Sequence, residues 1–151
     1  MNLRQKISKY YLLSALFIFF ACSQNEIFLN LKNLEWENRI IIVLSDKNTF
    51  VKEQIDELKI YPEEIIDRDL VIIYSEGDDL IVSFDGFESK NKIDEASYLN
   101  IHKKYYDKDS RFLLIGKDGG IKIDKNEFIE SKEIFRIIDD MPMRKIEMKN
   151  K

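Results

Sequence analysis

The chain of 151 residues contains one cysteine, Cys22, and one histidine, His102. A single cysteine cannot form an internal disulfide, and it excludes the two-thiol chemistry of a Cys-x-x-Cys site. One histidine and no Gly-x-Ser-x-Gly stretch give little support to a Ser-His-Asp hydrolase. We therefore do not expect an enzyme of a recognised redox or nucleophilic class.

Positive charge is also in short supply. The chain has 24 lysines and arginines against 28 aspartates and glutamates, for a formal net charge of −4. No basic patch dominates the sequence, so nucleic acid is not an expected partner. Acids are so abundant that no particular pair of carboxylates stands out as an acid–base pair.

Long apolar runs are absent except at the N-terminus. Three basic residues precede an apolar stretch over residues 10–21, which is the pattern of a secretory signal. The stretch is shorter than the about 20 apolar residues of a membrane-spanning helix. Cys22 follows it, where a bacterial lipoprotein signal places its acylated cysteine. Ala21 fits that pattern and the two phenylalanines before it do not. The alternative is ordinary cleavage after Ser23, which would discard the cysteine.

These features predict four segments: a lipoprotein-type signal peptide over 1–21, a tether over 22–30, a domain over 31–148 and a tail over 149–151. Acyl chains on Cys22 would hold the domain on a membrane, because each buried methylene contributes about 0.8 kcal/mol. No aspartate follows the cysteine, so we expect the outer membrane or the cell surface. A soluble periplasmic or secreted protein is the alternative.

Two short, unbroken apolar runs predict strands buried on both faces, over Arg39–Ser45 and Asp69–Ser75. Between them, apolar residues recur at helical spacing from Phe50 to Leu58, with Asp46 or Asn48 available as the N-cap. A strand–helix–strand order implies a right-handed crossover between parallel strands. Residues 76–92 form either a loop insertion or a short strand over Leu80–Phe84.

The second half of the chain predicts a helix, a hairpin and a last helix. Apolar residues at helical spacing follow Asp94, which is a plausible N-cap. A glycine-rich turn lies between Phe112–Ile115 and Ile121–Ile123, as in a β-hairpin. Ser131 is the expected cap of an amphipathic helix that continues to Met141. The order β-α-β-α-β-β-α matches a thioredoxin-like three-layer α/β sandwich, with a mixed sheet of about four strands.

Four stretches carry a resemblance to a known family: NLEWENR, DRDL, LLIGKDGGIK and IDDMPMRKIEM. Together they are similar to domain-of-unknown-function family four-one-seven-four, over roughly Leu31 to Met148. The resemblance implies a thioredoxin-like or peroxiredoxin-like fold and an exported protein. Similar domains occur in animal sushi-repeat-containing extracellular proteins. The family has no agreed activity, so the resemblance implies no reaction and no cofactor.

Thioredoxin-like enzymes place their reactive cysteine just after the first strand, where a helix N-terminus stabilises the thiolate. Here that position is Ser45–Phe50, which contains no cysteine. The proline that redox members place before the hairpin is also missing. We therefore do not expect redox catalysis. The polar residues would cap the helix, and anion binding there is the alternative.

Seven charged residues near these stretches are candidates for either a ligand site or a structural cluster. An arginine beside acids can anchor a loop with two hydrogen bonds, or bind a carboxylate or phosphate. The turn after Gly116 lacks the Walker pattern, because an aspartate follows the lysine. Structural anchoring is the preferred interpretation, and convergence on one cleft would favour an enzyme of unrecognised chemistry. The seven are Arg39, Arg68, Asp69, Lys117, Asp118, Asp140 and Arg144.

Three methionines near the C-terminus, Met141, Met143 and Met148, suggest a second hypothesis. Soft thioethers, with His102, could bind Cu(I) outside the cytoplasm. Methionine is also a routine filler of cores, which is the simpler explanation.

Taken together, the residues favour a tethered binding or adhesion module of the cell envelope, without a cofactor. Its partner would be an envelope protein or a small ligand. A copper-binding or chaperone-like protein is the alternative, and an enzyme of unrecognised chemistry is the second alternative.

Overall fold

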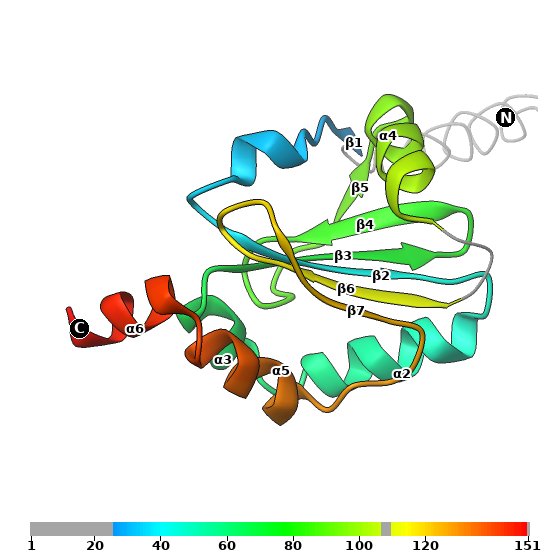
Figure 1. The fold of residues 1–151 in the computed structure, drawn as a ribbon. Helices are drawn as coiled ribbons and strands as arrows, with labels where there is room; N and C mark the ends of the chain where they lie inside the picture. Colours follow the sequence, from blue (N-terminus) through cyan, green and yellow to red (C-terminus); the bar gives the residue numbers. More distant parts are fainter. Residues whose placement is uncertain (1–25, 107–109, 151) are drawn as a thin grey trace, which may run out of the picture.

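The computed structural model describes residues 26–106 and 110–150 (Figure 1). The strands are β1 (Glu26–Ile27), β2 (Arg39–Leu44), β3 (Leu70–Glu76), β4 (Asp79–Ser83), β5 (Asn91–Ile93), β6 (Arg111–Ile115) and β7 (Ile121–Lys125). The helices are the 3₁₀ turn η1 (Leu31–Leu34), α2 (Asn48–Leu58), α3 (Pro62–Asp67), α4 (Glu95–Tyr105), α5 (Ser131–Asp139) and α6 (Pro142–Lys149).

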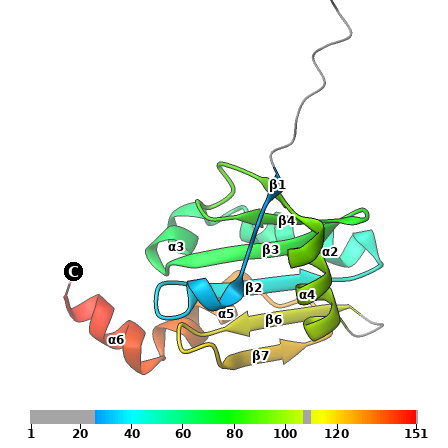
Figure 2. The same ribbon diagram turned by 90° about the horizontal axis from the view of Figure 1, so that it is seen from above.

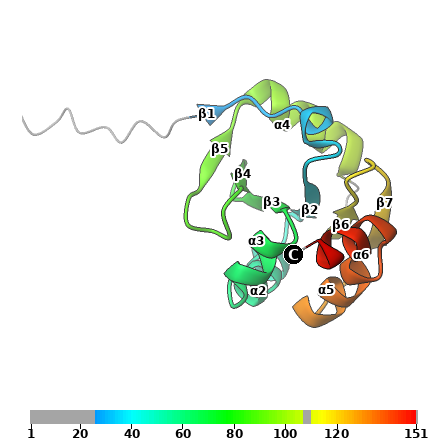
Figure 3. The ribbon, with the colours of Figure 1, turned by 90° about the vertical axis from the view of Figure 1, so that its left-hand side faces the viewer.

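All seven strands form one sheet in the order β1-β5-β4-β3-β2-β6-β7. The central strands β2 and β3 are parallel, and β6 and β4 flank them antiparallel. Helices α2, α3 and α5 cover one face, and α4 with η1 covers the other (Figure 3). The predicted α/β sandwich of three layers is therefore confirmed.

The apolar runs form strands because both faces of the sheet are covered. Along β2, Ile41 and Val43 face the α2–α3–α5 layer, whereas Ile40, Ile42 and Leu44 face α4. Each of the two resulting cores is made of alternate strand residues, as the period of two requires. Continuous burial explains why these strands read as unbroken Ile and Val runs.

The sheet has seven strands, not about four as predicted. β4 lies in the ambiguous segment and runs from Asp79 to Ser83. β1 has two residues and β5 has three. Strands of this length are too short for an apolar pattern to be recognised in the sequence. The sheet begins at Glu26, within the range 22–30 that was expected to be a tether.

The helix ends test the predicted caps. The Asp94 carboxylate accepts from Ser97 N–H at 2.8 Å, as predicted for the start of α4. At α2, the N-cap is Lys47, so neither Asp46 nor Asn48 serves. At α5, the N-cap is Glu130, and Ser131 is fully buried. The helix that was predicted to continue to Met141 is α5, which ends at Asp139, and Pro142 begins a further helix, α6, because proline suits the first helical turn.

The parallel pair gives the sheet two distinct ends. We call the end where β2 and β3 begin the N-terminal edge, and the end where they finish the C-terminal edge. α6 projects beyond the N-terminal edge (Figures 1 and 2). Among residues 26–106 and 110–150, no helix is long and apolar enough to span a membrane.

Candidate functional site

The four signature stretches meet at the N-terminal edge. Arg39 begins β2, and its Nη2 donates to both carboxylate oxygens of Glu147 on α6, at 3.1 Å each. Its Nη1 donates to the Arg68 carbonyl oxygen at 3.0 Å. Lys117, in the hairpin turn, places its Nζ 3.0 Å from Glu147 and 2.7 Å from Asp69. One carboxylate on α6 therefore holds two cations of the sheet edge.

A second carboxylate, that of Asp139, joins Arg68 and Arg144. Asp139, at the end of α5, accepts from Arg68 Nε and Nη2 at 3.0 and 2.6 Å. It also accepts from Arg144 Nε at 3.1 Å. Arg144 in turn donates to the carbonyl and the carboxylate of Asp67. We call the whole set the arginine network: Arg39, Glu64, Asp67, Arg68, Asp69, Lys117, Asp139, Arg144 and Glu147.

The cations of the network are buried, whereas the side chains of its carboxylates are 23% to 52% exposed, and the opposite charges compensate one another. Arg39 is 1% exposed and Arg144 is 3% exposed. Burial acts to lower the pKa of Arg68, but hydrogen bonds to Asp139 and Glu64 raise it above its usual value. Burial acts to raise the pKa of Glu147, but hydrogen bonds from Arg39 and Lys117 bring it below its usual value. Arg68 and Glu147 are therefore held in their charged forms.

The backbone around the network is strained. Trp36 has a φ of 71° and Asp69 a φ of 50°, in the left-handed region that glycine normally occupies. The Trp36 N–H donates to the Lys117 carbonyl oxygen at 2.6 Å, which fixes the loop before β2 to the hairpin turn. The Trp36 side chain itself is 63% exposed. Strain of this kind persists only where the surroundings over-determine it.

The charged side chains at this edge are already paired with one another, which limits their capacity to bind a ligand. A groove of about 460 Å³ lies over it, lined by Glu63, Ile66, Asp67, Asp69, Arg144 and Glu147. Its only cation, Arg144, already has carboxylate partners. The arrangement fixes α6 against the sheet, since Arg144 and Glu147 lie three residues apart on one helix face.

Five of the seven charged candidates therefore come together, and two do not. Asp118 pairs with Lys122 at 2.7 Å within the hairpin. Asp140 pairs with Lys145 at 3.2 Å on the exposed side of the α5–α6 junction. Sequence reasoning did not single out Glu147 or Glu64. For Glu147, the available signal was its spacing of three residues from Arg144, which places both side chains on one helix face.

At the C-terminal edge, the turn from β2 into α2 has polar side chains in place of a thiol. The Ser45 hydroxyl accepts from Lys47 N–H at 2.9 Å and lies 2.8 Å from the Ser110 hydroxyl. The adjoining pocket of about 340 Å³ is also lined by Asp46 and His102. Ser45 is thus engaged in holding the turn.

His102 and the methionines lie at opposite ends of the molecule. His102 stacks between Tyr98 and Tyr106 on α4, with ring centroids 5.2 and 4.1 Å apart. Met141 is half-buried against the core below the sheet, as a core filler would be. Met143 and Met148 are 37% and 42% exposed. The structure does not bring His102 to the methionines, and Cu(I) binding by thioethers alone stays a prediction.

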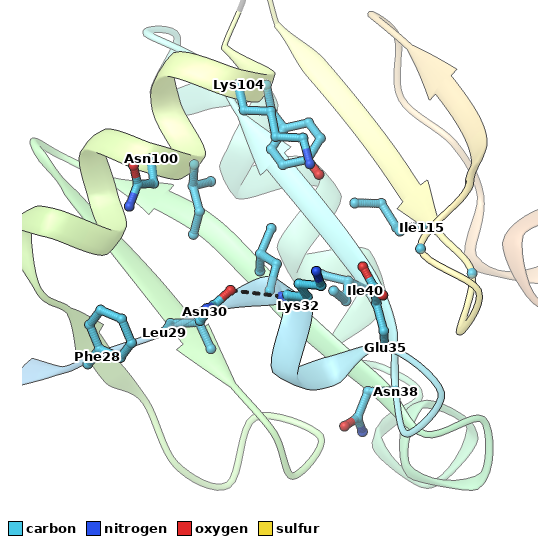
Figure 4. Close-up of a pocket in the computed structure, with 15 residues that line it drawn as sticks. Phe28, Leu29, Asn30, Lys32, Glu35, Asn38, Ile40, Asn100, Lys104 and Ile115 are labelled. Atoms are coloured by element: carbon cyan, nitrogen blue, oxygen red, sulfur yellow. Dashed lines mark hydrogen bonds between the residues drawn. The ribbon is translucent and has the colours of Figure 1, made fainter.

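A third cavity lies between α4 and the segment that leads into β2 (Figure 4). We call it the α4 pocket; its volume is about 410 Å³. Figure 4 shows Asn100 and Lys104 on the α4 side, with Asn30, Lys32 and Glu35 opposite them. The remaining lining residues are Phe28, Leu29, Leu31, Asn38, Ile40, Ile101, Tyr105, Ile115, Gly116 and Gly119.

Comparison with known proteins identifies the family. The profile of the family described as "Domain of unknown function (DUF4174)" matches residues 30–147, which include every member of the arginine network. The chain belongs to the DUF4174 family. No curated protein matched it.

Solved structures place the DUF4174 domain near peroxiredoxins in fold. It superposes on reduced Plasmodium vivax 2-Cys peroxiredoxin with a TM-score of 0.54 and 14% identity, covering 78% of this chain and 85% of that one. The mitochondrial 2-Cys peroxiredoxin of Plasmodium falciparum gives 0.54 and 14%, covering 82% and 85%. Thioredoxin peroxidase I of Plasmodium yoelii gives 0.53 and 12%, covering 78% and 80%. These likenesses confirm a thioredoxin-like fold.

Proposed function

We propose that this DUF4174 protein is an exported lipoprotein of the cell envelope, and that its thioredoxin-like domain binds a partner or small ligand without thiol redox chemistry. One observation carries the proposal. The turn between β2 and α2, where thioredoxin-like enzymes hold a reactive cysteine, contains Ser45, Asp46 and Lys47. Because Cys22 is the only cysteine, no other position can supply the thiol.

The hydrogen bonds at this turn support a structural role for the serine. The Ser75 hydroxyl accepts from Ser45 N–H and donates to the Ser45 carbonyl oxygen, at 3.2 Å each. The Ser45 hydroxyl and the Ser45 backbone are both held by hydrogen bonds, so the hydroxyl has little freedom to act as a nucleophile. A fold that keeps its architecture without the reactive group is available for recognition, although fold alone does not dictate function.

The position of Cys22 supports the anchor. It directly follows the apolar stretch of the predicted signal peptide and lies outside the described residues. The first described strand, β1, begins at Glu26, so three residues of sequence would separate the proposed acyl group on Cys22 from the sheet. An extended chain covers about 3.4 Å per residue, which keeps the domain close to the membrane surface.

Intact mass of the purified native protein tests the anchor, beside the Cys22→Ser variant and with membrane fractionation. We expect a mass of residues 22–151 plus acyl chains, and loss of both acylation and membrane retention in the variant. A mass that begins at Gln24, with protein in the soluble fraction, would contradict the anchor.

Reduction of insulin disulfides and consumption of peroxide test the absence of redox activity. We expect the native protein and Cys22→Ser to be equally inactive, because the domain supplies no thiol to either reaction. Turnover that Cys22→Ser abolishes would show that the cysteine is reactive, and the proposal would then fail.

A further inference from the structure

The α4 pocket has an apolar base. Ile40, Ile101 and Ile115 are each at most 3% exposed, and they come from β2, α4 and β6. Leu29 and Leu31 close the base from the lead-in segment. Its volume of about 410 Å³ lies within the range of small-molecule sites, which is roughly 300–1,000 Å³. The base therefore suits a compact hydrocarbon group.

The rim of the pocket carries two lysines from opposite walls. Lys32 belongs to η1 and Lys104 to α4 (Figure 4). Among the described residues, neither lysine has a carboxylate within 4.0 Å, although most of the other lysines that the structure describes form ion pairs on the surface or in the network. Lys104 Nζ lies 4.9 Å from the Tyr105 ring, and the Lys32 ammonium has no such neighbour.

The rest of the rim offers neutral hydrogen-bonding groups and one acid. Asn100 lies on α4, and Asn30 lies in the lead-in segment, where its Oδ1 accepts from Lys32 N–H at 3.0 Å and caps η1 (Figure 4). Glu35 lies beside Gly119, where a Cβ would come within 3.1 Å of its Oε1. The charged residues that line the pocket are Lys32, Lys104 and Glu35, so the lining is net positive in a chain whose net charge is −4.

We propose that the α4 pocket binds a small amphipathic organic anion, with a carboxylate head between Lys32 and Lys104 and an apolar tail against Ile40, Ile101 and Ile115. The inference rests on the proposed binding function and names its ligand class. The two lysines supply charge-assisted hydrogen bonds to the carboxylate.

Calorimetric titration with decanoate tests the ligand class, using the Cys22→Ser chain so that no acyl group competes. Decanol has the same tail without the charge, and acetate has the same head without the tail. We expect saturable binding of decanoate and at least about tenfold weaker binding of the other two. Equal binding of decanol and decanoate, or no decanoate binding at about 1 mM, would overturn the proposal.

Two variants test the place of binding. Lys32→Gln and Lys104→Gln each remove a rim charge at an exposed position, so we expect both chains to fold and to bind decanoate about three- to tenfold more weakly. Lys103→Gln is the matched control, because Lys103 is the exposed neighbour of Lys104 and does not line the pocket. Unchanged decanoate affinity in both rim variants would overturn the assignment.

The two proposals fail separately. Thiol-dependent turnover would end the proposed non-redox function and would leave decanoate binding as measured. Absence of decanoate binding, with no turnover and intact acylation, would reject only the ligand class of the α4 pocket.

Discussion

The arginine network and the α4 pocket lie on two sides of one hairpin turn, and they use positive charge in opposite ways. Lys117 extends from that turn into the network, whereas Gly116 and Gly119 line the pocket. Every cation in the network has a carboxylate partner and little exposure. The two pocket lysines are exposed and have no carboxylate partner among the described residues. Paired, buried charge fixes an element in place; unpaired charge beside an apolar cavity remains available for a ligand.

The largest expected effect is in the network. Asp139→Ala removes the carboxylate that the buried Arg68 and Arg144 share. Each arginine keeps another carboxylate partner, Glu64 or Asp67, and the Asp139 side chain is 32% exposed, so the expected cost is about 3 kcal/mol, at the lower end for a broken buried pair. We expect a loss of that order in the free energy of unfolding measured with urea. Asp140→Ala is the control, since Asp140 is exposed and its pair with Lys145 contributes less than about 1 kcal/mol. Equal losses in the two variants would remove the distinction between buried and exposed pairs.

The next largest expected effect is on the pH dependence of the free energy of unfolding. The pKa of Glu147 in the folded protein lies below its ordinary value of 4.5. Its charge therefore stabilises the fold above pH 4.5, and the contribution is lost as the pH falls through the folded pKa. Glu147→Gln should reduce stability at pH 7 by about 1–3 kcal/mol. The two unfolding free energies should converge in acid, and a constant difference across the pH range would contradict this account.

A smaller effect is expected at the shared turn. Gly119 has a φ of +72°, and a Cβ there would meet the Glu35 carboxylate, so Gly119→Ala should cost about 1–2 kcal/mol. Gly77→Ala is the matched control, because Gly77 has a φ of +63° with open space around it. Thermal unfolding of both variants separates the cost of the contact with Glu35, which only Gly119→Ala incurs, from the cost of a side chain at positive φ, which both variants incur.

The smallest effect is expected at the pocket rim. Lys32→Gln and Lys104→Gln should change the free energy of unfolding by less than about 0.5 kcal/mol, because neither lysine forms an ion pair with a described residue. A loss above about 1 kcal/mol in either variant would mean that the lysine supports the fold, and the contrast with the network would disappear.

Local patterns were enough to predict the elements that are long and buried. The runs at Arg39 and Asp69, the hairpin and the helix capped by Asp94 follow from apolar periodicity and turn chemistry. The strands β1 and β5 were missed because they have only two and three residues, which is too few to show the alternation of apolar and polar side chains that marks a strand. The prediction of a single last helix missed α6, which begins at Pro142 because the restricted φ of proline suits the first helical turn.

The site was predictable only in part, because it is assembled across the sequence. Arg39 and Lys117 were candidates from their local context, but their shared partner Glu147 lies 108 residues from Arg39. No local signal marks a carboxylate as the one that two distant cations will share. The α4 pocket was missed altogether, since Lys32 and Lys104 are ordinary surface lysines until the lead-in segment packs over α4.

The pairing of β1 with β5 has a mechanical consequence. Glu26 and Ile27 lie parallel to Lys92 and Ile93, and Lys92 Nζ is 3.2 Å from the Glu26 carboxylate. With the proposed acyl anchor at Cys22, any pull between the membrane and the domain acts first on this two-residue pairing. Its rupture would pass the tension directly to Phe28 and Leu29, so the wall of the α4 pocket would be the first part of the domain to yield under load.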